Sequence, residues 1–116
     1  MKKKVKYTII EGNKFVNLTD HPIQLLHKGK FIEIPKSGIV TKTNYEVLEQ
    51  GVRKTFKYNY VVGLPGPEEN TYYIVSALTL NGVRKLHPER TDVVAPFKVQ
   101  KYDNGVTYCE GLRHNG

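Results

Sequence analysis

The stretch GLPGPEENTYYIVSALTLNGVRKLHPERTDVVAP, residues 63–96, carries the clearest structural signals in the chain. It begins with a loop, because two prolines and two glycines within GLPGPEEN (63–70) are incompatible with a helix. TYYIV (71–75) is an uninterrupted β-type apolar run, which predicts a central buried strand. Ser76 then offers a helix N-cap. ALTLNGVRKL (77–86) is therefore a short helix or a further strand, and Pro88 ends it.

The rest of the chain repeats the pattern of short β-like runs between turn residues. Hairpin turns are indicated at Glu11-Gly12-Asn13, at Lys28-Gly29 and at Asp103-Asn104-Gly105. A chain of 116 residues is one domain, and it is long enough to bury a core without a metal or a disulfide. We therefore expect a single domain, residues 1–116, that is mainly β: a small antiparallel barrel or sandwich with at most one short helix. The predicted strands are residues 5–10, 14–18, 23–27, 30–34, 39–48, 53–62, 71–75 and 93–100.

The net charge of +7 is unevenly distributed. Residues 1–60 carry 12 Lys and Arg against 5 Asp and Glu, whereas residues 61–116 carry 6 of each. Such asymmetry favours a polyanionic or phosphorylated partner. The lysines at positions 2, 3, 4 and 6 supply over half of the excess, and residues 1–4 are expected to form a flexible basic tail. The positive excess in residues 1–60 therefore has two possible explanations, a solvated tail and an anion-binding surface.

The single cysteine, Cys109, has no partner for an internal disulfide, which favours a reducing compartment. The N-terminus is basic but lacks the apolar run of a signal peptide or a membrane span. We expect a cytoplasmic protein with no membrane partner. A homo-oligomer remains open.

The sequence shows no group of residues with the pattern of a catalytic site. We interpret Ser76 as a helix cap rather than a nucleophile. We interpret Cys109 as a small buried apolar residue rather than a nucleophile. The four histidines show no metal-ligand spacing, and there is no phosphate-binding loop or dinucleotide motif. Asp92 follows Arg90 by two residues, which suits a local ion pair that fixes a loop. We expect no enzymatic activity, no cofactor and no metal.

RKTFKYNYVV (53–62) is the cleanest strand pattern. By alternation, Phe56, Tyr58 and Tyr60 share one face with Lys54, and the opposite face carries Arg53 and Lys57 among polar residues. We favour an ordinary packed core for the three aromatic residues. Aromatic residues interleaved with Lys and Arg are equally the components of a surface that stacks bases and holds phosphates.

A second cationic group follows the predicted central strand, where Arg84, Lys85, His87 and Arg90 fall within seven residues. These side chains either converge at the rim of a pocket or lie on an exposed turn. The candidate ligand-binding residues are cations for phosphate and tyrosines for base stacking: Arg53, Lys57, Arg84, Arg90, Tyr58 and Tyr73.

Several short pieces occur together in a characteristic order: FVNLTDHPIQLL, IPKSGIV, GLPGPEENTYYIVSALTLNGV and RTDVVAPFKVQKYDNGV, followed by Cys109 and Gly111. In this order they resemble a family of small proteins encoded by phages and prophages, with the pattern NLTPH…PSG…GLP…YIVS…RxD…DxGV. The resemblance covers residues 15–112. Asp20 stands where the family pattern has Pro, and Lys36 stands where Pro is common; both departures fall in turns.

The resemblance implies a phage accessory protein that works in the bacterial cytoplasm, and it transfers no activity residue by residue. Together with the positive charge, it suggests an anti-defence inhibitor that sequesters an anionic nucleotide signal without turnover. Two alternatives stay open: a nonspecific single-stranded nucleic-acid-binding domain, and an inhibitor that binds a host defence protein directly.

Overall fold

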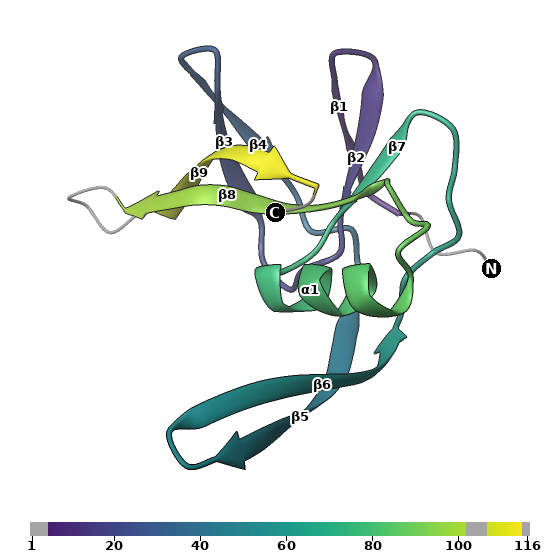
Figure 1. Cartoon of the computed structure of the whole chain (residues 1–116). Helices are drawn as coiled ribbons and strands as arrows, with labels where there is room; N and C mark the ends of the chain where they lie inside the picture. Colours follow the sequence, from purple (N-terminus) through teal and green to yellow (C-terminus); the bar gives the residue numbers. More distant parts are fainter. Residues whose placement is uncertain (1–4, 102–106, 115–116) are drawn as a thin grey trace.

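The computed structural model describes residues 5–101 and 107–114, and in these residues the protein is mainly β with one helix (Figure 1). The basic tail expected at residues 1–4 and the turn expected at residues 103–105 lie outside the described residues. The elements are β1 (Thr8–Ile10), β2 (Asn13–Asn17), β3 (Ile23–His27), β4 (Lys30–Ile34), β5 (Lys42–Gln50), β6 (Arg53–Val62), β7 (Thr71–Ile74), α1 (Ala77–Leu86), β8 (Val93–Lys101) and β9 (Thr107–Arg113).

Seven strands form one mixed sheet in the order β1-β2-β7-β8-β9-β3-β4, and β5 and β6 form a separate two-stranded sheet. The expected hairpins β1–β2 and β3–β4 are confirmed, and β7 lies inside the sheet as predicted for a central strand. The pairing differs from expectation at three places, because β2–β7, β7–β8 and β3–β9 are parallel. Parallel neighbours need a crossover connection, and α1 supplies the one between β7 and β8.

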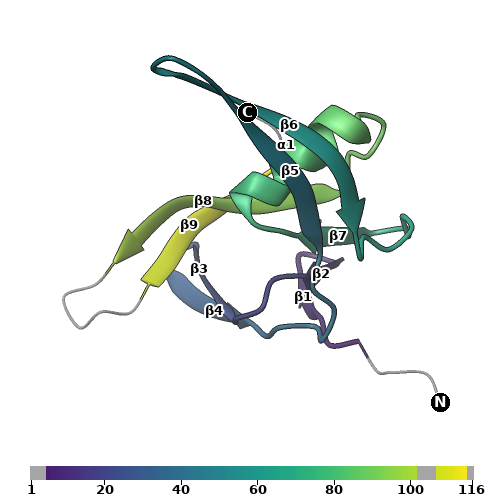
Figure 2. The same ribbon diagram turned by 90° about the horizontal axis from the view of Figure 1, so that it is seen from below.

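The helix begins where the sequence predicts. The Ser76 side chain accepts a hydrogen bond from the Thr79 backbone N–H at 3.2 Å, as an N-cap does. Gly82 lets α1 approach β5 and β6, because a Cβ at this position would collide with the Thr43 hydroxyl and lie 3.3 Å from the Tyr58 ring. The helix is thereby fixed between the large sheet and the β5–β6 hairpin (Figure 2).

The inner strands β7 and β8 bury side chains on both faces. Tyr73 and Val75 pack on the α1 side with Leu80 and Val83, together with Val16, Leu18, Val93 and Ala95. Ile74 and Val94 point to the opposite, concave side, where they meet Ile10, Ile23, Leu25, Ile34 and Cys109. Because both faces are covered, the strand reads as a continuous apolar run rather than an alternating one.

The buried side chain of Asn17 joins the two ends of the curved sheet. Its amide nitrogen donates to the His21 carbonyl at 2.8 Å and to the Ile34 carbonyl, at the end of β4, at 3.2 Å. Its amide oxygen accepts from the Thr19 backbone N–H and hydroxyl. The Ser37 N–H donates to the Asn17 carbonyl at 2.9 Å. These bonds bring the segment after β4 against the end of β2, which makes the sheet barrel-like.

Replacing Asn17 with Ala is expected to lower the free energy of unfolding by about 2–3 kcal/mol, because the Ile34 carbonyl loses its side-chain donor inside the protein. Urea denaturation followed by circular dichroism measures this change. Asn81→Ala, at an exposed position of α1, is the matched control. A loss of less than about 0.5 kcal/mol for Asn17→Ala, the range of ordinary surface changes, would contradict the role of this amide.

Candidate functional site: the β5–β6 arm

The β5–β6 hairpin extends away from the body of the protein, and we call residues 42–62 the arm (Figures 1 and 2). Most of its side chains are exposed, including large apolar ones. Its contacts with the rest of the structure are chiefly with α1, and Val61 reaches the core on the α1 side. An arm of this kind adds little to the core, so its sequence is free to serve contacts with another molecule.

The cross-strand register assigns the arm's side chains to two faces. The helix-side face carries Tyr45, Val47, Phe56 and Tyr58, whose three rings contact one another with centroids 5.6–6.5 Å apart. Lys54 lies on this face and pairs with Glu49 at 3.7 Å. The outer face carries three cations and one aromatic residue: Lys42, Arg53, Lys57 and Tyr60.

A β-bulge at Asn59 changes the face on which Tyr60 lies. Tyr45 is opposite Tyr58, but the next residue back, Asn44, is opposite Tyr60, so Asn59 has no cross-strand partner. The Asn59 side chain instead donates to the Asn44 side chain at 2.8 Å. Simple alternation, which placed Tyr60 beside Phe56 and Tyr58, is therefore wrong beyond the bulge.

The interpretation of Phe56 and Tyr60 as core residues is also wrong, since their exposed fractions are 48% and 55%. Tyr58 alone of the three is partly covered, by α1 at Gly82. The core that these aromatic residues were expected to join is built instead by β2, β7, β8 and α1. A two-stranded hairpin with solvent on most of both faces has nothing to pack them against.

The outer face combines positive charge with an aromatic surface. None of the ion pairs within the described part of the chain involves Lys42, Arg53 or Lys57. Glu46, opposite Lys57, is the one carboxylate on this face. Tyr60 lines a shallow hollow of about 340 Å³ with Lys42, Asn44 and Val62. An exposed aromatic ring beside a lysine side chain is an arrangement that can hold a stacked base and its phosphate.

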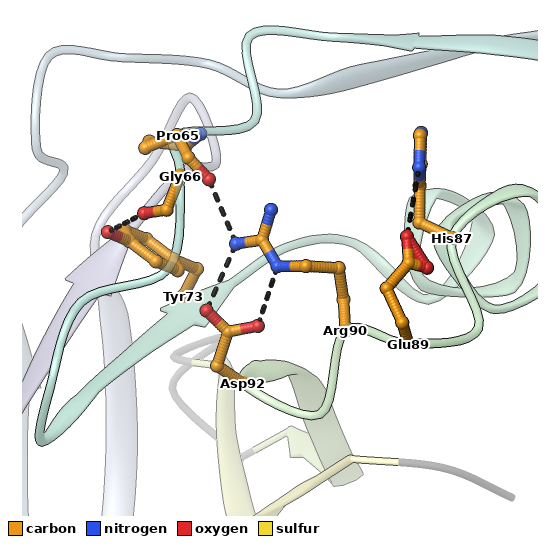
Figure 3. Close-up of polar contacts among 7 residues, drawn as sticks. All are labelled: Pro65, Gly66, Tyr73, His87, Glu89, Arg90 and Asp92. Atoms are coloured by element: carbon orange, nitrogen blue, oxygen red, sulfur yellow. Dashed lines mark hydrogen bonds and ion pairs between the residues drawn. The ribbon is translucent and has the colours of Figure 1, made fainter.

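Arg90 and Tyr73 take part in a network inside the protein (Figure 3). Arg90 donates from Nε and Nη2 to the two carboxylate oxygens of Asp92, at 2.9 and 3.0 Å, and from Nη2 to the Pro65 carbonyl at 2.9 Å. The Tyr73 hydroxyl donates to the Gly66 carbonyl at 2.9 Å. The network fastens the 63–70 loop to β7 and to the start of β8.

The predicted Arg90–Asp92 ion pair is therefore confirmed, and its geometry corrects the assignment of Arg90 and Tyr73 to a ligand site. Tyr73 is only 3% exposed, so no base can stack on it. The hydrogen bonds to Asp92 raise the pKa of the Arg90 guanidinium, and burial raises the pKa of the Tyr73 hydroxyl. Both shifts reflect groups that serve the fold.

The six sequence-predicted residues thus lie in separate places. Arg53 and Lys57 are together on the outer face, Tyr58 is on the opposite face of the same strand, and Arg90 and Tyr73 form the internal network. Arg84 is exposed in the last turn of α1, where a cation complements the helix dipole. Tyr60 was missed because the sequence carries no reliable signal for the bulge that moves it to this face, and Lys42 was missed because its place beside Tyr60 depends on the pairing of β5 with β6.

Sites for catalysis or metal binding are not evident in the residues that the structure describes. No three His, Cys, Asp or Glu side chains among residues 5–101 and 107–114 are grouped so that they could hold a metal ion. Cys109 is buried, and burial raises the pKa of its thiol, which disfavours the reactive thiolate. No helix in the described part of the chain is long and apolar enough to cross a membrane.

No protein-family model, no curated protein and no solved structure matches this chain.

Removing the Arg90 side chain by Arg90→Ala is expected to lower the free energy of unfolding by about 2–3 kcal/mol, because it leaves the Asp92 carboxylate, 15% exposed, without its cation. Nucleic-acid binding by the folded variant should be unchanged. Chemical denaturation measures the first quantity, and fluorescence anisotropy with a labelled oligonucleotide measures the second. Arg84→Ala, at an exposed position, serves as the control. Unchanged stability combined with lost binding would restore Arg90 to the ligand site.

Proposed function

We propose that this protein is a non-enzymatic phage-type accessory protein that holds single-stranded nucleic acid on the outer face of the arm. The observation that carries the proposal is the bulge at Asn59, which brings Tyr60 onto the face that carries Lys42, Arg53 and Lys57. Positive side chains that follow an extended strand, with an aromatic ring among them, suit a polynucleotide backbone and its bases.

Each residue has a distinct role in this proposal. The Tyr60 ring stacks on one base, and Lys42, beside it in the same hollow, contacts the adjoining phosphate. Lys57 and Arg53 contact phosphates further along the strand. The positive excess in residues 1–60 adds a sequence-independent attraction that raises the association rate.

The spacing of the cations favours a polymer over a single nucleotide. Arg53 and Lys57 are four residues apart on β6, so their backbones are separated by about 13 Å in an extended strand. Two cations at that distance do not converge on one phosphate, and Arg90 is already paired with Asp92. The outer face therefore supports the nucleic-acid-binding alternative better than the nucleotide-signal hypothesis.

The resemblance to phage proteins suggests the setting. A protein that coats or sequesters single-stranded nucleic acid in the host bacterium could shield it from defence or supply it to phage enzymes. We expect binding without turnover, so an oligonucleotide incubated with the protein should be recovered intact by chromatography.

Substitutions on the two faces of β6 test the proposal. Tyr60→Ala should weaken binding of a labelled 20-mer by about 1–3 kcal/mol, the effect of removing one stacking platform. Lys57→Ala should weaken binding across all sequences and reduce the slope of log affinity against log salt by about 1. Lys54→Ala is the matched control, because it removes the same charge three residues away on the opposite face.

Fluorescence anisotropy titrations at two or more salt concentrations measure these effects. Equal losses for Lys54→Ala and Lys57→Ala would show that only net charge matters, and the outer-face site would be wrong. Thermal-shift measurements with mono-, di- and cyclic nucleotides examine the earlier hypothesis. A large shift with a small nucleotide, together with no binding of the 20-mer, would favour the nucleotide signal as ligand.

A further inference from the structure

A second hollow, unrelated to the arm, lies at the end of the curved sheet between the β1–β2 and β3–β4 hairpins. Its volume is about 630 Å³, within the range of small-molecule sites in proteins. Its walls are largely apolar and include Ile10, Leu25, Val94 and Leu112. Phe15 and Tyr72 stack on the same wall with ring centroids 5.3 Å apart. We call this hollow the barrel-mouth cavity.

The rim of the barrel-mouth cavity holds one carboxylate between two basic groups. Glu11, at the turn between β1 and β2, places its Oε1 3.0 Å from His27 Nε2 and 2.9 Å from Lys28 Nζ. His27 ends β3, and Lys28 belongs to the turn that follows it. The contact therefore bridges two hairpins that lie at opposite ends of the strand order. Hydrogen bonds from Lys28 and then His27 lower the pKa of the Glu11 carboxyl.

Both turns that supply this contact hold a strained residue. Glu11 has φ 52° and Lys28 has φ 51°, and each is followed by a glycine with positive φ. Two-residue hairpin turns of this kind strongly favour Asn, Asp or Gly at the first position, because side chains with a longer stem are disfavoured in the left-handed region. The chain has Glu and Lys there instead. Their side chains form an ion pair at the edge of the cavity, which Glu11 lines, and this suggests a role for these two groups beyond forming the turns.

We propose that the barrel-mouth cavity binds a small free anion with an apolar body, such as a medium-chain carboxylate, whose head group replaces the Glu11 carboxylate beside His27 and Lys28. The apolar chain lies against Ile10, Leu25 and Val94, where its burial supplies most of the affinity. Glu11 thus acts as an internal occupant of the anion position and is displaced into solvent when the ligand binds.

The charges at the rim select an anion over a cation or a neutral molecule. A cationic head group would gain Glu11 but would lie beside Lys28. A neutral head group would leave the Glu11 contact in place and gain no ionic partner of its own. An anion regains both His27 and Lys28 as donors, so it exchanges one carboxylate for another at the same position.

Displacement of the fluorescent anion 1-anilinonaphthalene-8-sulfonate from the full chain tests the proposal. Decanoate should displace the probe, and decyltrimethylammonium, with the same chain and opposite charge, should not. Lys28→Ala should weaken decanoate binding about three- to tenfold, since a hydrogen bond to a charged group is lost at an exposed position. Glu11→Gln should strengthen it by a similar factor, because the internal competitor loses its charge.

Matched variants separate the cavity from net charge and from other apolar surfaces. Glu33→Gln changes the net charge as Glu11→Gln does, and Lys36→Ala removes a lysine as Lys28→Ala does; both should leave decanoate binding unchanged. Phe56→Ala reports any binding to the arm and should also have no effect. Thermal melting of each variant, monitored by circular dichroism, confirms that it is folded.

Three results would overturn the proposal. The first is displacement by decyltrimethylammonium as strong as that by decanoate. The second is an equal effect of Glu11→Gln and Glu33→Gln. The third is co-sedimentation with phosphatidylglycerol vesicles together with no displacement by decanoate, which would assign the surface to a membrane rather than to a free anion.

Discussion

The buried side-chain amide of Asn17 holds together the junction on which the positions of the curved sheet and of the arm depend. Its bonds to the His21 and Ile34 carbonyls hold the end of β2 against the end of β4, which belong to opposite ends of the sheet order. The next residue, Leu18, continues the same junction, since its N–H donates to the Ile74 carbonyl and its carbonyl accepts from the Thr41 N–H. The chain leaves this junction at Thr41 and enters β5 at once. The position of the arm therefore depends on a polar group buried inside the body.

The arm differs physically from the body because the buried residues of both core clusters belong to the body. Strands β7 and β8 are buried on both faces, one under α1 and one inside the curved sheet. Most large apolar side chains of the body are therefore removed from solvent without the arm. The Arg90 network adds a second polar fastening, which holds the 63–70 loop against β7. Among the described residues, β5 and β6 pack chiefly on α1, Val61 reaches the core, and the outer face of the arm is exposed.

Local signals allowed much of the fold to be predicted. The Ser76 cap, the glycine turns and the continuous TYYIV run each act within a few residues, and each corresponds to an element of the structure. The Arg90–Asp92 pair was also predictable because its partners are two residues apart. The parallel pairings and the face of Tyr60 were not, since they depend on long-range register and on one unpaired residue, Asn59. For that reason Tyr60 replaced Tyr58 beside Arg53 and Lys57 in the candidate site.

Amine labelling of the lysines, read by mass spectrometry with and without a bound 20-mer, tests the nucleic-acid site most directly because it resolves individual side chains. The account predicts that Lys42 and Lys57, on the outer face, become protected while Lys54, three residues from Lys57 on the opposite face, is labelled as before. Equal protection of Lys54 and Lys57, or protection confined to lysines of the body such as Lys14 and Lys28, would contradict it.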